Sequence, residues 1–272
     1  MKKPENHSLL LKEVSIPEIP KDRMGEHPFR VPLVRARPSL AFKRPVTILV
    51  GENGTGKSTL LESIAVAAGS VAVGGHSLDR DESLGQARAL ANYLRLSWAK
   101  KTRKGFFLRS EDFFNFAKRV REEQAELRSM ADEFGAKYKG YGRMLAMGAA
   151  LGQSQALKAQ YGEDLDANSH GESFLRLFQS RLTPGGLYIL DEPEAPLSPV
   201  RQIALIAMIQ DCVKDGSQFL IATHSPILMA FPEAQILNIE GDSISPKPFS
   251  ELEHVKVTKA FLNNPDSFLR HL

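Results

Sequence analysis

The segment Gly51-Glu52-Asn53-Gly54-Thr55-Gly56-Lys57-Ser58 matches a phosphate-binding glycine-rich loop at every position that defines this motif. The apolar run Pro45–Val50 before it is typical of a buried parallel strand, and Thr59–Ala68 after it has helical composition and spacing. Strand, loop and helix is the context that the motif requires. The alternative interpretation, a glycine-rich turn that binds no ligand, does not account for the strand before the segment and the helix after it. The segment therefore indicates that the chain binds a nucleoside triphosphate.

Each position of this loop has an expected role. The glycines let backbone N–H groups surround a phosphate, and the N-terminus of the following helix adds a favourable dipole. Lys57 is expected to reach the β and γ phosphates, and the Ser58 hydroxyl is expected to ligate magnesium. The residues predicted to contact the nucleotide here are Gly51, Glu52, Asn53, Gly54, Thr55, Gly56, Lys57, Ser58 and Thr59.

A second apolar strand, Leu187–Leu190, ends in the carboxylates of Asp191 and Glu192. An aspartate at the end of a buried strand can hold magnesium beside the phosphates. The glutamate after it can act as a general base on the water that attacks the γ-phosphate. A strand followed by a solvated acidic turn is the alternative, and the phosphate-binding loop upstream favours the catalytic interpretation.

His224 follows another strand-like run, Phe219–Ala222, within the sequence Thr223-His224-Ser225-Pro226. A histidine at a strand end can contact the γ-phosphate or the attacking water, whereas an ordinary loop histidine does neither. We therefore take His224 as a third candidate catalytic residue, together with Lys57 and Glu192.

The overall composition is that of an ordinary globular protein. The chain has 272 residues, of which 42% are hydrophobic and 25% are charged, with a formal net charge of +3. This charge is too small to demonstrate a polyanionic partner. Cys212 is the only cysteine, so an internal disulfide is impossible. No apolar run approaches the roughly 18 residues of a membrane span. We expect a cytoplasmic protein without direct membrane insertion.

Apolar strands that alternate with helices predict an α/β fold with a mainly parallel sheet. The strand-like runs Gly186–Leu190, Gln218–Ala222 and Gln235–Ile239 follow one another, with an apolar helix over Pro199–Lys214 between the first two. Before the glycine-rich loop, Ser8–Ile16 and Pro32–Phe42 are expected to form antiparallel β segments.

We interpret the chain as a single domain over residues 1–272, with a nucleotide-binding core at 1–74 and 169–240 and a C-terminal extension at 241–272. A mainly helical insertion is expected over residues 75–168. Within it, the sequence predicts a helix at Asp79–Arg95, a strand at Gly105–Arg109 and a charged helix at Ser110–Phe134. A helical hairpin of this length would reach at most ~75 Å. The glycines after Phe134 are expected to break the segment into short pieces, so no long coiled coil is predicted.

Taken together, these motifs resemble the ABC-type ATPase superfamily, and in particular its stand-alone branch related to RecF and SMC proteins, often labelled AAA-family ATPases. The resemblance covers residues 40–74 and 169–237. Ser169-His170-Gly171-Glu172-Ser173-Phe174 occupies the place of the family's signature sequence. The resemblance implies that the chain hydrolyses ATP with Mg²⁺. It also implies a homodimer with composite sites, in which Ser169, Gly171 and Glu172 contact the nucleotide bound by the opposite subunit.

The chain departs from the family pattern at two places. Ser198 stands where the family's D-loop usually has aspartate, which leaves communication between two nucleotide sites in doubt. The Q-loop glutamine has no clear match, and Glu111 is a substitute at a suitable place in the topology. Phe29 precedes the loop at a plausible distance for stacking on adenine, or is simply a core residue.

Three functions therefore stay open. The first is an ATP hydrolase whose ATP-driven dimerisation acts as a switch on an unidentified protein partner, with roles in defence or DNA repair. The second is the ATPase subunit of an ABC transporter, which the missing glutamine and the non-transporter signature disfavour. The third is a nucleic-acid-binding ATPase of the SMC/RecF kind. The run Trp98–Phe107 has four cations between aromatic residues. It either binds nucleic acid, through phosphate contacts and base stacking, or forms a solvated basic loop.

Overall fold

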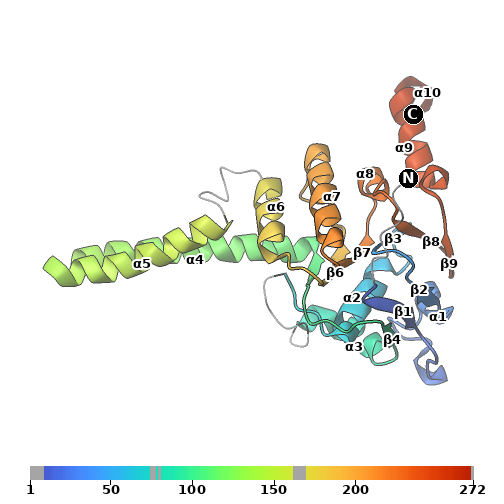
Figure 1. Cartoon of the computed structure of the whole chain (residues 1–272), viewed down its shortest axis with the longest axis horizontal. Helices are drawn as coiled ribbons and strands as arrows, with labels where there is room; N and C mark the ends of the chain where they lie inside the picture. The colour runs from blue at the N-terminus through green and yellow to red at the C-terminus, as the bar shows by residue number, and fades with distance from the viewer. Residues whose placement is uncertain (1–8, 74–77, 79–80, 162–169, 271–272) are drawn as a thin grey trace.

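The computed structural model of the chain describes residues 9–73, 78, 81–161 and 170–270 (Figure 1). Its centre is a six-stranded sheet in the order β5-β6-β7-β3-β8-β9. The strands are β3 (Val46–Gly51), β5 (Phe107–Arg109), β6 (Leu187–Asp191), β7 (Gln218–Ala222), β8 (Gln235–Glu240) and β9 (Ser243–Pro246). All pair in parallel except β9, which is antiparallel to β8. The predicted mainly parallel sheet is confirmed.

Helices cover both faces of this sheet, which explains why its central strands β3, β6 and β7 are buried along their whole length and mostly apolar. Successive residues of β3 point to opposite faces, so Ile48 belongs to one core and Leu49 to the other. The first core lies under α6 (His170–Arg181), α7 (Pro199–Lys214) and α8 (Pro226–Met229). The second lies under α2 (Lys57–Ala68) and α3 (Gly85–Ala91). The predicted helix over Pro199–Lys214 has the observed bounds of α7.

A smaller antiparallel sheet closes the second core. Its order is β2-β1-β4, with β1 at Leu11–Ser15, β2 at Ser39–Ala41 and β4 at Arg95–Trp98. The Gln218 side chain joins the two sheets, because its Oε1 accepts hydrogen bonds from the N–H groups of Leu10 and Leu11 at 2.9 and 2.8 Å. The expected N-terminal antiparallel segments are therefore present.

Two local predictions differ from the structure. The first half of Pro32–Phe42 is a short helix, α1 (Pro32–Arg35), because proline suits the first position of a helix and cannot donate in a sheet. The predicted helix at Asp79–Arg95 is shorter: a 3₁₀ turn at Glu82–Leu84 leads into α3, and Arg95 already belongs to β4. Residues 79–80 lie outside the described part of the chain.

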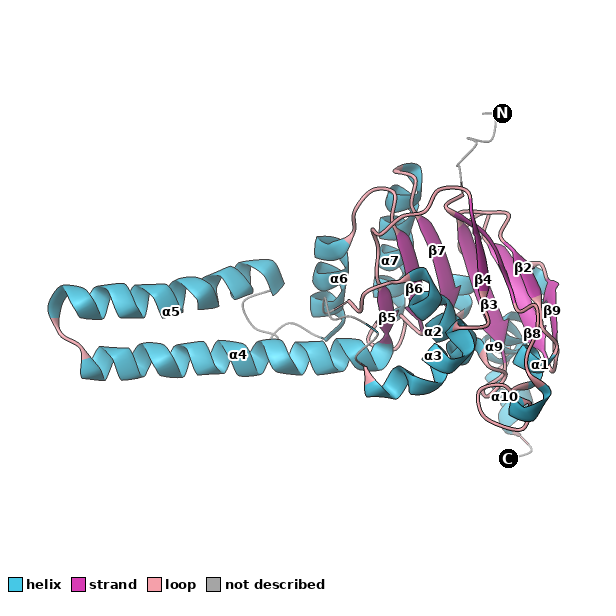
Figure 2. Ribbon diagram, turned by 90° about the horizontal axis from the view of Figure 1, so that it is seen from below, coloured by secondary structure: helices cyan, strands magenta, loops and turns pink. Residues whose placement is uncertain are grey.

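The largest correction concerns the insertion. Helices α4 (Ser110–Lys137) and α5 (Gly140–Tyr161) lie side by side and project from the body as a hairpin, which we call the arm (Figures 1 and 2). A helix of 28 residues is about 42 Å long. The predicted break-up after Phe134 is wrong. A glycine inside a helix costs only about 1 kcal/mol, and packing of the two helices against each other offsets that cost.

The chain ends in a turn at Phe249–Glu251, helix α9 (Glu253–Asn263) and helix α10 (Pro265–Leu269). Leu252 and Val255 anchor the start of α9 in the first core, whereas residues 256–263 are exposed. No helix within the described residues has both the length and the apolar character needed to cross a membrane.

Candidate nucleotide site

Three adjacent parallel strands bring the predicted catalytic residues to one edge of the sheet. Strand β7 lies between β3 and β6, with Leu49 paired to Ala222 and Ala222 paired to Asp191. All three strands run in the same direction, so the loops after them emerge at the same edge. Lys57, His224 and Glu192, which are far apart in the sequence, therefore meet there.

The glycine-rich loop has the backbone conformation that its sequence predicts. Gly54 and Gly56 have φ angles of +79° and +99°, in the left-handed region that favours glycine. At Gly56 an added Cβ would also lie 2.5 Å from Val31 Cγ1. The Lys57 ammonium donates hydrogen bonds to the carbonyl oxygens of Gly51 and Glu52 at 2.7 and 2.8 Å, so it lies over the hollow of the loop.

Lys57 is buried at 5% exposure, which is unusual for a lysine. Burial lowers its pKa, and the nearby carboxylates of Asp191 and Glu192 oppose this effect. A desolvated ammonium interacts more strongly with a phosphate than one in water does. The loop thus brings a positive charge and the N-terminus of α2, which has no side-chain cap, to the place where a triphosphate would lie.

Asp191 and Ser58 provide a fitting pair of ligands for Mg²⁺. The two side chains are hydrogen-bonded, and burial raises the pKa of Asp191 to about 6, with Glu192 acting in the same direction. Asp191 Oδ1 is buried and has no hydrogen-bond partner among the described residues. Carboxylate and hydroxyl oxygens suit Mg²⁺, which keeps several water or phosphate ligands of its own. Within the described residues, no group of three or more His, Cys, Asp or Glu side chains could hold a metal ion.

Glu192 lies at the turn after β6 with a φ angle of +50°, which is uncommon for a residue other than glycine. Its backbone N–H donates to the Ala222 carbonyl oxygen at 2.9 Å, which ties this turn to the end of β7. Its carboxylate is half-exposed and lies 3.8 Å from His224 Nε2. A strained backbone at a strand end directs this side chain toward the edge where the loop, Asp191 and His224 meet.

Two residues that the sequence does not single out, Glu194 and Gln202, hold His224 and the neighbouring Ser225 in place. Glu194 Oε1 accepts a hydrogen bond from the backbone N–H of His224 at 2.8 Å. Gln202, buried on α7, donates to the Leu197 carbonyl oxygen at 3.1 Å and accepts from the Ser225 hydroxyl. These bonds connect the loop after β6 with the loop after β7. The pattern Glu-Pro-Glu contains Glu194, but nothing around Glu194 or Gln202 identifies its partner, which lies 30 positions away for Glu194 and 23 for Gln202.

The junction of β5 and α4 lies beside Asp191, in the region proposed for Glu111. Arg109 pairs in register with Asp191 and forms ion pairs with four carboxylates, from Glu62, Asp81, Glu111 and Asp112, at 2.8–3.5 Å. Glu111 remains two-thirds exposed.

The neighbouring Ser110 contacts the turn after β6. Its hydroxyl donates to the Glu192 carbonyl oxygen at 2.5 Å. Arg109 stands at the N-cap of α4, and Ser110 is the first residue of this helix.

The signature segment is described only in part, because Ser169 lies outside the described residues. Gly171 is in the first turn of α6 and is buried, and an added Cβ would lie 2.8 Å from both the Pro196 carbonyl oxygen and Arg201 Cδ. This close packing by itself accounts for a glycine at position 171, whether or not a ligand binds there. Glu172 forms ion pairs with Arg176 at 2.8 Å and with Arg201 at 3.8 Å. The predicted contacts of these residues with a second subunit remain predictions.

Phe29 is a core residue. It is 1% exposed and packs edge-on against Tyr93 with the ring centroids 5.3 Å apart, so it has no free face for adenine.

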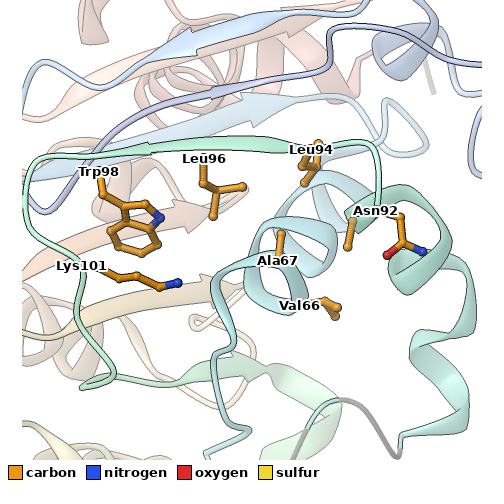
Figure 3. Close-up of a pocket in the computed structure, with 8 residues that line it drawn as sticks. Val66, Ala67, Asn92, Leu94, Leu96, Trp98 and Lys101 are labelled. Carbon is orange, nitrogen blue, oxygen red and sulfur yellow. The ribbon is translucent and has the colours of Figure 1, made fainter.

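The basic run after β4 borders a cavity of about 530 Å³ at the end of α2 away from the glycine-rich loop. Trp98, Leu96 and Lys101 line it on one side, and Val66 and Ala67 of α2 on the other (Figure 3). Lys100, Lys101, Arg103 and Lys104 are exposed. This cavity is separate from the edge that carries the catalytic candidates.

Comparison with protein families gives two matches, both to AAA domains. One AAA-domain model matches residues 34–145. A second, whose description refers to the AbiEii toxin of type IV toxin–antitoxin systems, matches residues 173–230. A search of curated proteins gave no match.

Among solved structures, the chain is similar to an ATP-binding cassette of an ABC transporter, with 18% identity, a TM-score of 0.50, and 97% of this chain and 99% of that chain covered. A nucleotide-free cassette from an ABC transporter is 16% identical, with a TM-score of 0.46 and coverage of 82% and 88%. At such identities the likeness to the first of these shows the fold alone. It agrees with the α/β core and the additional antiparallel sheet described above.

Proposed function

We propose that this chain, which carries a P-loop ATPase domain of the AAA and ABC-like type, hydrolyses ATP and acts as an ATP-dependent dimerising switch on a protein partner. The observation that supports this most directly is the order of the strands. It puts Lys57, His224 and the Asp191–Glu192 pair at one edge of the sheet, around a single glycine-rich loop. We place this activity in the cytoplasm.

In this proposal the residues divide the work of phosphoryl transfer to water. The N–H groups of the loop and the Lys57 ammonium bind the phosphates. Ser58 and Asp191 hold Mg²⁺, which neutralises negative charge on the phosphate oxygens when bound. Glu192 accepts a proton from the attacking water, and its half-exposed carboxylate suits a group that must meet a water molecule. His224 stabilises the γ-phosphate from the neighbouring strand end.

A second subunit would complete the site. A single glycine-rich loop leaves one side of the γ-phosphate open to water, and the resemblance of residues 169–174 to a signature sequence suits them to close it. The N-terminus of α6 would then point its dipole at the phosphate. Figure 1 shows α6 at the base of the arm beside α7, so its first turn is carried by the body of the domain. The signature of one copy would meet the loop of the other.

Sedimentation of the Glu192→Gln variant tests this proposal. Loss of the general base should reduce turnover by about 10²–10⁴-fold while ATP still binds. The closed state then persists, so Glu192→Gln should dimerise with ATP and Mg²⁺ and dissociate when ATP is removed. Glu126→Gln, an exposed change on α4, is the matched control and should behave as the native protein does. A Glu192→Gln protein that stays monomeric at saturating ATP and Mg²⁺ would exclude self-pairing and favour a different partner.

A mixing experiment tests the composite site. Each site would use Lys57 and Glu192 from one chain and Ser169 from the other. Lys57→Ala and Ser169→Arg should each be inactive alone, whereas a mixed dimer contains one intact site. Recovered turnover in the mixture, absent from either protein alone, supports composite sites that can act singly.

A further inference from the structure

The C-terminal extension contributes a histidine to the catalytic edge. His254 lies in the first turn of α9, and its Nε2 is 3.4 Å from His224 Nδ1, with ring centroids 5.5 Å apart. Leu252 and Val255, on either side of His254, are buried in the first core. This first turn is therefore held against α8, and the position of His254 is set by core packing.

The contacts of His224 leave a single ring nitrogen available. Glu194 binds its backbone N–H, and His254 meets its Nδ1. Its Nε2 is buried and has no hydrogen-bond partner within the described residues. This nitrogen lies 3.8 Å from Glu192 Oε1, on the side where the γ-phosphate and the attacking water are proposed to lie.

The protonation of His224 decides what Nε2 can do. Burial lowers the pKa of His224 and the Lys57 ammonium acts in the same direction, whereas Glu192 opposes both. The neutral ring is thus favoured, and a neutral imidazole carries its proton on one nitrogen only. A hydrogen bond at Nδ1 consequently determines whether Nε2 is a donor or an acceptor.

We infer that His254 is a positioning residue for His224: its Nε2–H donates to His224 Nδ1 and so keeps the His224 proton on Nε2. In this tautomer His224 can donate a hydrogen bond to a phosphate oxygen or to Glu192. The reverse tautomer would direct a lone pair at those oxygen atoms and repel them. The consequence for turnover rests on the proposed function, whereas the position of the proton does not.

Nuclear magnetic resonance of protein labelled with ¹⁵N-histidine tests the tautomer directly. Long-range ¹H–¹⁵N couplings report which ring nitrogen carries the proton, and a His224→Gln variant assigns the signals. Two variants of equal shape supply the comparison, His254→Gln, which can donate, and His254→Glu, which can only accept. Native protein and His254→Gln should carry the proton on His224 Nε2, and His254→Glu should place a proton on Nδ1. A native His224 protonated on Nδ1, or a His254→Glu variant with Nδ1 unprotonated, would overturn the inference.

Turnover of the same variants tests the consequence. His254→Gln should keep kcat within about threefold of the native value, while His254→Glu should lose about tenfold, as expected for one misdirected hydrogen bond. The KM for ATP should stay within about twofold in both. A role in packing alone would affect two side chains of the same shape equally, so equal kcat values would contradict the positioning role. If the native protein has no turnover at all, the proposed function fails, and the ring-proton measurement decides this inference by itself.

Discussion

Glu194 Oε1 and the backbone N–H of His224 are joined by a hydrogen bond of 2.8 Å, which links the loop after β6 to the loop after β7. Burial raises the pKa of Glu194, and its hydrogen bond from His224 opposes this effect. The two loops carry the proposed general base and the proposed γ-phosphate contact. Their relative position therefore depends on a side chain that does not itself touch the reacting atoms.

This link predicts a difference between two substitutions of Glu194. Glu194→Gln keeps an oxygen acceptor for the His224 N–H and should retain turnover within about threefold. Glu194→Ala leaves that partly buried N–H without its acceptor, which costs about 1–3 kcal/mol, and should lower kcat by at least tenfold. Steady-state ATPase assays at saturating ATP measure both. If Glu194→Ala turns over at the native rate, the link does not position His224.

Lys57→Ala should weaken ATP binding by about 10–100-fold, because a charge-assisted hydrogen bond to phosphate contributes about 1.5–3 kcal/mol. Calorimetric titration with ATP measures the affinity. The melting temperature should not fall, since the substitution removes a buried ammonium whose desolvation is unfavourable. Lys256→Ala, an exposed change on α9, serves as the control. Native affinity in Lys57→Ala would mean that the loop binds no triphosphate.

Glu62 should make stability depend on pH. Burial raises its pKa from 4.5 to about 7, although Arg109 opposes the shift. A carboxyl whose pKa is raised on folding favours the protonated folded state, so its contribution is complete below pH 4.5 and is lost as the pH rises through 7. A shift of this size corresponds to about 3 kcal/mol.

Urea unfolding at pH 5 and pH 8 measures this effect. The native protein should lose about 2–3 kcal/mol more of its unfolding free energy over this range than Glu62→Gln does. Glu126→Gln should keep the native dependence on pH. The same dependence in native protein and Glu62→Gln would show that Glu62 is ionised in the folded state at both pH values.

The basic run after β4 predicts salt-sensitive binding of DNA or RNA, if it contacts phosphates. Replacing Lys100, Lys101, Arg103 and Lys104 by alanine should then abolish a log–log salt slope of about −3.6 on duplex DNA. A matched control replaces four exposed cations elsewhere, Arg35, Lys43, Lys256 and Lys259. Gel-shift titration over a series of salt concentrations measures the slope. Absence of binding at low salt would identify this loop as a solvated surface or a protein-docking element.

The motifs that depend on local chemistry could be predicted from the sequence. Gly54 and Gly56 need left-handed backbone, and the buried strands that end at Gly51, Asp191 and Ala222 are mostly apolar runs, so their places along the chain follow from residue types alone. The long helix that begins at Ser110 was predicted for the same reason. The glycines after Phe134 do not break the helices, because packing of α4 against α5 stabilises both helices in spite of Gly135, Gly148 and Gly152.

Only the tertiary structure decided which residues meet. The order of β6, β7 and β3 puts Glu192, His224 and Lys57 together, and sheet order depends on non-local pairing that residue types do not reveal. Core packing of Leu252 and Val255 brings His254 to His224, thirty residues away in the sequence, and no sequence pattern around His254 predicts this contact. Phe29 is the opposite case: its distance from the glycine-rich loop along the sequence suits stacking on adenine, but the side chain is buried in the core. Residue types thus determined what each segment can bind, and burial and strand order determined which of them act together.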